Sequence, residues 1–175
     1  MLKEKKNMER RILLSIIMVL AVAFFGCTKE PVKTADGYWE SAREYFEKGD
    51  YEQTVQEYQK LIRYYPQDSL TVKAYFAVAE IYKNNLKDLN KSIESYSTIV
   101  EQYSDHPKTP NAMFMIGYIY ANDLNDLENA KNSYEKFIEK YPDHMLVPSA
   151  KWEIENMGKS LDEIPQLQTI SKGGN

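Results

Sequence analysis

Residues 74–89 read AYFAVAEIYKNNLKDL, and residues 112–127, 38 positions further on, read AMFMIGYIYANDLNDL. The same 38-residue spacing relates two sets of tyrosines: Tyr58, Tyr96 and Tyr134, and Tyr65, Tyr103 and Tyr141. A period of about 20 to 50 residues is typical of stacked arrays, in which each unit buries its apolar face against its neighbours. Such arrays present extended surfaces to other proteins. The repeat therefore favours a binding module over an enzyme.

Apolar residues within each unit recur at helical spacing. Val55, Tyr58, Leu61 and Tyr65 form one such stripe in the first unit, and the next two units repeat it. Proline closes segments at Pro66, Pro107 and Pro142, and no useful length of strand-like alternation occurs. The sequence therefore predicts an all-α fold with two helices of about 13 residues in each unit.

Residues of fixed type mark the three units. They are Tyr38, Ala42, Tyr45, Tyr58 and Pro66, then Tyr75, Ala79, Tyr82 and Tyr96, and then Met113, Gly117, Tyr120, Ala130, Tyr134 and Pro142. This pattern resembles the tetratricopeptide (TPR) repeat, in which small residues let helices A and B of a hairpin approach closely. The resemblance implies an α-solenoid domain over 36–164, with repeats at 36–69, 70–107 and 108–145. A terminal capping helix is expected at 148–162, followed by a flexible tail at 165–175.

The start of the chain has the features of an export signal. Five basic residues precede an almost wholly apolar run of 14 residues, Ile12 to Phe25, which is short for a spanning helix of about 20 residues. Cys27, the single cysteine, follows Gly26, and this arrangement resembles a bacterial lipobox. We expect a signal peptide at 1–26 and a lipidated amino terminus and spacer at 27–35. Two alternatives remain: an uncleaved membrane anchor, and a cysteine without lipid.

Charge and motifs exclude several functions. The leader holds five basic and two acidic residues, so residues 28–175 carry 17 Lys and Arg against 24 Asp and Glu, a net charge of −7. An acidic body without a basic stripe argues against nucleic-acid binding. His106 and His144 are 38 residues apart in equivalent Asp-His pairs, so the repeat accounts for them better than a metal site does. We expect no catalytic residues, no metal, no small-molecule substrate and no cofactor apart from lipid on Cys27.

Aromatic residues suggest where a partner binds. Trp39, Phe76, Phe114 and Trp152 share one helix-A position, next to the aromatic residue that the family buries. The resemblance places helix A along a concave groove, so one hypothesis is an aromatic ladder flanked by Arg43, Glu80, Lys83 and Tyr118. The alternative is that these rings pack between hairpins.

The lipobox, residues 36–53 (DGYWESAREYFEKGDYEQ) and residues 61–66 (LIRYYP) together resemble the BamD group of outer-membrane lipoproteins. Residues 120–126 (YANDLND) and 141–144 (YPDH) also resemble the C-terminal repeats of the Tol-Pal coordinator YbgF. These resemblances imply a non-enzymatic scaffold, lipid-anchored in the bacterial outer membrane and facing the periplasm. Its partners would be envelope proteins of the β-barrel assembly or Tol-Pal type. The alternative is an inner-membrane-tethered periplasmic repeat protein that assists secretion or folding.

Overall fold

The structure is a computed structural model that describes residues 33–160 and 163–164 of the 175-residue chain. Within these ranges there are seven α-helices and no strand, which confirms the predicted all-α fold. The helices are α2 (Ala35–Glu47), α3 (Tyr51–Tyr64), α4 (Ser69–Ile81), α5 (Leu89–Gln102), α6 (Thr109–Tyr118), α7 (Leu127–Lys140) and α8 (Val147–Asn156). Two π-helical turns, Tyr82–Leu86 and Ile119–Asp123, extend α4 and α6.

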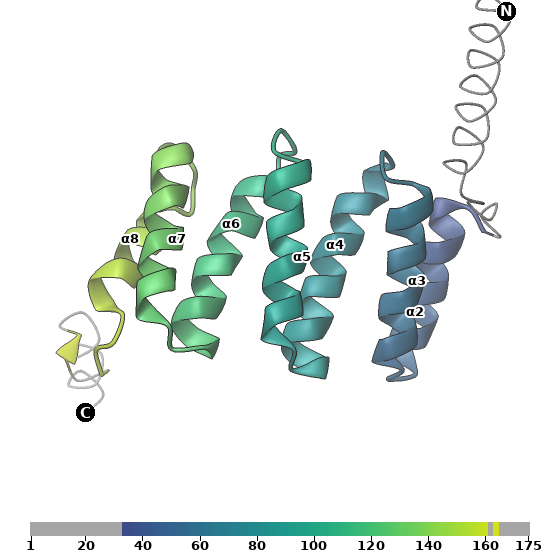
Figure 1. Ribbon diagram of the computed structural model, residues 1–175, viewed down its shortest axis with the longest axis horizontal. Coiled ribbons are helices and arrows are strands. Elements are labelled where there is room, and N and C mark those ends of the chain that lie inside the picture. The colour runs from purple at the N-terminus through teal and green to yellow at the C-terminus, as the bar shows by residue number, and fades with distance from the viewer. Residues whose placement is uncertain (1–32, 161–162, 165–175) are drawn as a thin grey trace, which may run out of the picture. The chain divides into compact units, whose positions relative to one another are not determined.

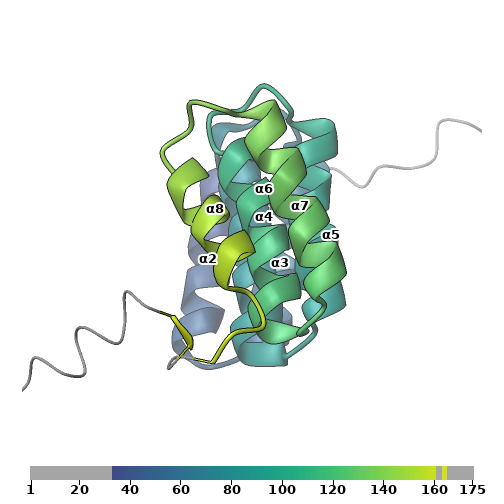
Figure 2. The same ribbon diagram turned by 90° about the vertical axis from the view of Figure 1, so that its left-hand side faces the viewer.

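Three helical hairpins, α2/α3, α4/α5 and α6/α7, stand side by side, and α8 packs on the last (Figure 1). The first helices of the hairpins and α8 form one layer, and α3, α5 and α7 form the other (Figure 2). We call the outer side of the layer α2, α4, α6 and α8 the helix-A face. Each hairpin contacts mainly its neighbours in sequence, as expected for a solenoid.

Acidic caps fix where the second helix of each hairpin begins. The carboxylates of Asp50, Asp88 and Asp126 each accept a hydrogen bond of 3.1 Å from the backbone N–H three residues later. Such side chains satisfy donors that a helix leaves unpaired at its start. Their 38-residue spacing keeps the three hairpins in register.

Both histidines lie in the turns that lead from one hairpin to the next helix, and there they have a structural role. Asp68 accepts a hydrogen bond of 2.8 Å from the N–H of Leu70 at the start of α4. His106 and His144 occupy the equivalent places, and their Nδ1 atoms accept from the N–H groups of Lys108 and Leu146 at 3.1 and 3.2 Å. Each histidine thus accepts a hydrogen bond from a backbone N–H group that the start of a helix would otherwise leave unpaired.

The π-helical turns absorb one extra residue in the second and third hairpins. The N–H of Asp50 donates to the carbonyl of Tyr45 at 3.0 Å, whereas the N–H of Asp88 reaches the carbonyl of Tyr82, six residues back, at 2.8 Å. The same link joins Asp126 to Tyr120. The chain therefore starts the next helix from the same anchor despite its greater length.

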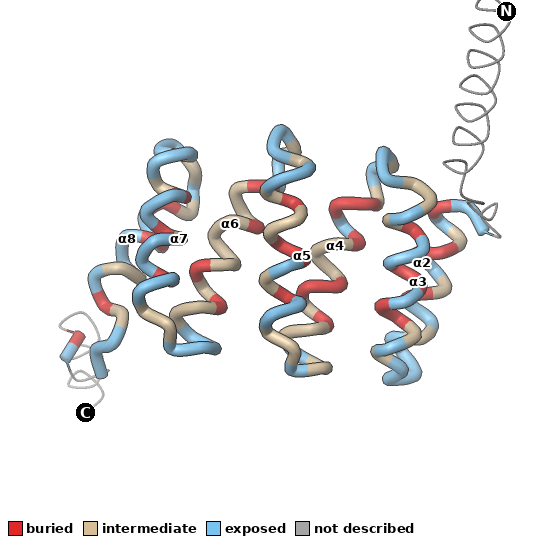
Figure 3. Tube along the Cα trace, viewed as in Figure 1, coloured by how far each residue is buried: buried red, intermediate tan, exposed pale blue. Residues whose placement is uncertain are grey.

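Buried residues occur in helices of both layers (Figure 3). In this core, small residues of the first helix of each hairpin pack with tyrosine rings of the second helix. Ala42, Ala79 and Gly117 are each buried at this contact. A Cβ atom placed on Gly117 would lie 2.8 Å from two ring carbons of Tyr134, which is itself fully buried. Close approach of the ring to the backbone therefore requires glycine in the third hairpin.

The ends of the domain differ slightly from the predicted boundaries. The spacer was expected to reach residue 35, but Ala35 is buried in α2 and Lys33 donates to the carboxylate of Glu57 on α3 at 2.8 Å. The Tyr65 hydroxyl also donates to the carbonyl of Lys33 at 2.8 Å. The chain is therefore fixed to the first hairpin from Lys33 onward.

The terminal helix is shorter than the predicted 148–162. It runs from Val147 to Asn156, and Met157 already leaves helical geometry with a ψ of 136°. Gly158 then adopts a φ of +79°, a conformation that ends helices. The leader at 1–26, Cys27 and the tail at 165–175 lie outside the described residues.

Candidate interaction surface

The aromatic residues on the helix-A layer pack against tyrosines of their own hairpins. The ring-centroid distances are 5.0 Å for Trp39–Tyr58, 5.4 Å for Phe76–Tyr96 and 5.3 Å for Phe114–Tyr134. The three helix-A rings are half-buried, so each gives one part of its surface to the core and another to solvent. This packing lies within hairpins, whereas the sequence alternatives were a free ladder or packing between hairpins.

Trp152 differs from the other three rings. It lies on α8, which has no partner helix after it in the described part of the chain, and it is 40% exposed. Its carbonyl accepts a hydrogen bond of 2.8 Å from the buried amide of Asn156. The backbone carbonyl at Trp152 is therefore held, while the residue remains partly open to solvent.

Glu80 receives two hydrogen bonds on this face. The Tyr96 hydroxyl donates at 2.6 Å and the Asn84 amide at 2.8 Å. Burial, followed by the hydrogen bond to Glu80 and its charge, raises the pKa of Tyr96 well above its usual value. Glu80 is thus held by two neutral donors, and it has no cation bound to it among residues 33–160.

The third hairpin lacks this arrangement. Tyr118 stands where the second hairpin has Glu80, and the buried hydroxyl of Tyr134 has no hydrogen-bond partner among residues 33–160 and 163–164. Burial, followed by the charge of Glu153 on α8, raises the pKa of Tyr134. Burial also raises the pKa of Glu153, against an opposing hydrogen bond from Asn122. The two hairpins are therefore similar in backbone but different in surface chemistry.

Lys83 links the second and third hairpins. Its amino group lies 3.4 Å from the carboxylate of Asp123 and 5.5 Å from the ring centroid of Tyr118. The side chain is only 16% exposed, so much of its charge is satisfied within the protein. Lys83 of the second hairpin and Tyr118 of the third thus contact each other across the boundary between two repeats.

Arg43 and Glu80 come together at a cavity of about 290 Å³ between α2 and α4. We call it the α2–α4 cavity. Its lining consists of Arg43, Phe46, Glu47, Tyr58, Ala77, Glu80, Ile81, Asn84 and Asn85. Arg43 is about half exposed and pairs with Glu40 at 3.2 Å. The remaining predicted residues lie elsewhere on the helix-A layer.

Phe46, Ala77 and Asn84 also line the cavity and were not predicted from the sequence. Phe46 is 46% exposed and follows Trp39 by seven residues, so it falls on the same side of α2. Ala77 and Asn84 flank Glu80 at helical spacing on α4 and its extension. The spacing of seven residues from Trp39 was the signal available in the sequence.

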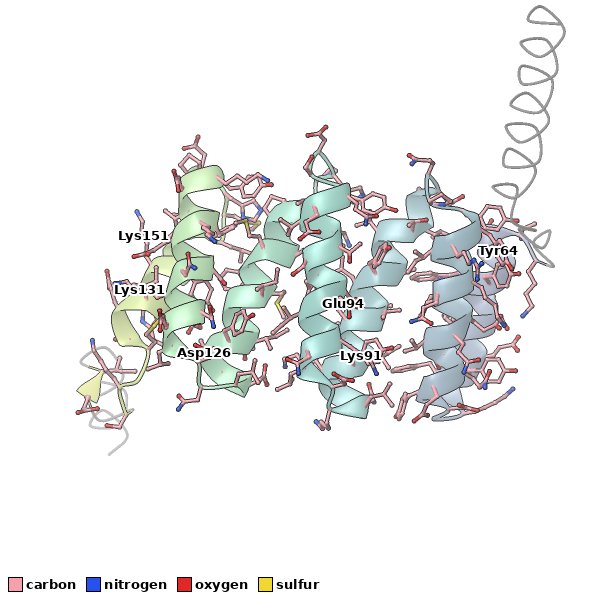
Figure 4. The ribbon with its side chains drawn as sticks, in the orientation of Figure 1. Tyr64, Lys91, Glu94, Asp126, Lys131 and Lys151 are labelled. Atoms are coloured by element: carbon pink, nitrogen blue, oxygen red, sulfur yellow. The ribbon has the colours of Figure 1, made fainter. Side chains whose placement is uncertain are left out.

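The opposite side of the stack has cavities that recur with the repeat. One of about 360 Å³ lies between α3 and α5 and includes Lys91 and Glu94 (Figure 4). One of about 150 Å³ lies between α5 and α7, and most of its lining residues occupy the equivalent positions 38 residues later. Their recurrence indicates that they follow from the stacking of hairpins.

Among residues 33–160 and 163–164, no cluster of three or more histidine, cysteine or acidic side chains is arranged to hold a metal ion. No described helix combines the length and apolarity needed to cross a bilayer.

Comparison with known proteins identifies the repeat. A family model for the tetratricopeptide repeat matches residues 36–68, 73–106 and 111–144. Two solved structures of kinesin light chain TPR-like repeats from Podosopora anserina, one of them a single-residue variant, are similar in fold. Each has a TM-score of 0.56 and 12% identity and covers 97% of this chain and 86% of the other. No curated protein sequence matches the chain.

Proposed function

The chain belongs to the tetratricopeptide-repeat family. From this membership and from the sequence of residues 1–27 we propose that it is a non-enzymatic lipoprotein scaffold of the bacterial cell envelope. It binds partner proteins on its helix-A face. The observation that carries the proposal is the α2–α4 cavity, which combines an exposed Phe46 ring with the charged groups of Arg43 and Glu80. Aromatic rings and arginine are the residue types that most often anchor interfaces.

Binding on this face requires little rearrangement. Trp39 and Phe76 are held by their tyrosine partners, and Lys83 is held by Asp123. A surface that is ordered before binding loses less conformational entropy when a partner arrives. A peptide segment or a helix of the partner would lie across α2 and α4.

Membrane attachment is the second part of the proposal. The basic leader, the short apolar run and Cys27 support acylation of that cysteine and removal of residues 1–26. A lipid anchor would concentrate the protein at the membrane and so favour binding to partners there. We place the scaffold at the outer membrane, facing the periplasm, in β-barrel assembly or a related envelope complex.

Metabolic labelling with an alkyne-bearing fatty acid tests the anchor. We expect label on the wild-type chain, none on Cys27→Ala, and a mature protein beginning at residue 27. An unlabelled chain that keeps its leader would contradict the lipoprotein assignment and favour the uncleaved inner-membrane tether.

Photo-crosslinking in the native host tests the binding face. A photoreactive amino acid at Phe46 should capture one defined envelope protein, whereas the same amino acid at Gln59, in the cavity between α3 and α5, should not. Capture of β-barrel assembly components supports that pathway, and capture of Tol-Pal components supports a role in envelope constriction. Equal crosslinking from both positions would contradict binding on the helix-A face.

A further inference from the structure

The charge around the α2–α4 cavity is unbalanced. Glu47 and Glu80 both line it, and neither forms an ion pair within the described ranges. Arg43 also lines it, but its guanidinium already pairs with Glu40 through contacts of 3.2 and 3.3 Å. The lining together with Glu40 therefore has a net charge of −2.

The carboxylate of Glu80 is held in one orientation. Tyr96 and Asn84 each donate to a different oxygen of the carboxylate, and their hydrogen bonds hold its orientation. Neutral donors leave the negative charge uncompensated. An approaching cation would therefore meet an oriented carboxylate without first breaking an internal ion pair.

The remainder of the cavity is apolar. The Tyr58 ring, Ala77 and Ile81 are buried or half-buried lining groups, and the exposed Phe46 ring stands beside them. A cavity of about 290 Å³ lies at the lower end of the range for ligand pockets. It is suited to one or two side chains of a peptide rather than to a large cofactor.

We infer that the α2–α4 cavity binds a peptide segment of a partner protein in which a bulky apolar side chain stands next to lysine or arginine. The apolar side chain fills the space beside Ala77, and the cation pairs with Glu47 or Glu80. This inference rests on the proposed scaffold function and specifies the chemistry of its partner. Complementary charge adds specificity and association rate to the energy of the buried side chain.

A peptide selection tests this chemistry. Phage displaying random dodecapeptides are selected on the full-length chain held in detergent micelles, and each enriched peptide is then synthesised and its affinity measured by fluorescence anisotropy. We expect enriched peptides to place leucine or an aromatic residue beside lysine or arginine. Binding should weaken as salt is raised, because the charges are close to solvent.

Three variants assign the contacts. Glu47→Gln and Glu80→Gln each remove one charge with little change of shape and should weaken binding by about two- to fivefold, the range for partly exposed ion pairs. Ala77→Leu fills the cavity and should weaken binding by about tenfold or more, because a well-packed anchor side chain is displaced. Glu94→Gln and Thr98→Leu, in the cavity between α3 and α5, are the matched controls and should leave affinity unchanged.

The outcomes separate this inference from the scaffold function. Enrichment of acidic peptides, or of none, overturns the inference, as does equal affinity for the cavity variants and their controls. If crosslinking from Phe46 still captures an envelope protein, the scaffold function stands and only the partner chemistry is rejected. If crosslinking also fails, both are rejected.

Discussion

Gly117 provides a direct test of how tightly the third hairpin is packed. Ala42 and Ala79 occupy the equivalent place in the first two hairpins, so comparison of the repeats suggests that Gly117→Ala would stabilise the chain. Removing a glycine from a helix gains about 1 kcal/mol in helix propensity. The structure predicts the opposite net effect.

The magnitude follows from the distances around the added methyl group. It would lie 2.8 Å from two ring carbons of Tyr134 and 3.1 Å from a third, well inside ordinary contact distance. Tyr134 is fully buried and packs on Phe114, so its ring has little room to move. Overpacking of this kind costs about 1–3 kcal/mol. After the propensity gain is subtracted, we expect a net loss of about 1 kcal/mol, or about 4 °C in melting temperature.

Thermal unfolding of the full-length chain in detergent, followed by far-ultraviolet circular dichroism, measures this change. In a Tyr134→Ala background the three ring carbons that the methyl group meets are absent, so Gly117→Ala should become stabilising by about 1 kcal/mol. Ala79→Gly is the reverse control and should destabilise by a similar amount. A rise in melting temperature for Gly117→Ala alone would refute the close contact with Tyr134.

Three other groups of variants test individual interactions. Tyr134→Phe removes a buried hydroxyl that has no partner in the described part of the chain, and it should be neutral or stabilising. Tyr96→Phe removes a donor to Glu80 and should cost about 1 kcal/mol in chemical unfolding. Burial alone would raise the pKa of Glu57, but hydrogen bonds from Lys33 and Lys60 outweigh it and lower that pKa. The stability that Glu57 adds should be present above its unfolded-state pKa and disappear as pH falls through the folded-state pKa; an acid titration in which Glu57→Gln tracks the wild type throughout would contradict this. His106→Leu removes the acceptor for the Lys108 N–H and should cost about 0.5–2 kcal/mol, whereas His106→Asp keeps an acceptor and should retain stability in the same melts.

The fold was predictable because the 38-residue spacing applies to the residues that pack. Tyr58, Tyr96 and Tyr134 are all buried, and the aspartate caps repeat with them. The family match over three repeats confirms the TPR prediction. Nothing in the family match or in the similar structures bears on the BamD and YbgF resemblances, which stay predictions.

The binding surface was only partly predictable because it depends on contacts between hairpins. Arg43 and Glu80 were chosen from the sequence, but the cavity that joins them depends on how α2 and α4 are spaced. Similarly, the pairing of Lys83 with Asp123 depends on the π-helical turn that carries Asp123. A one-dimensional pattern identifies the side of a helix, whereas the distance between neighbouring helices is a result of packing.

The attachment of Lys33 to the first hairpin limits the distance that a membrane-anchored domain could reach from the bilayer surface. If Cys27 carries the lipid, only the links from residue 27 to residue 33 separate the bilayer from the first fixed point of the domain, which is about 20 Å of fully extended chain. The α2–α4 cavity lies on that same first hairpin and its neighbour. With that anchor, a partner would have to present its binding segment close to the membrane surface, and segments far from the bilayer would be beyond the reach of this cavity.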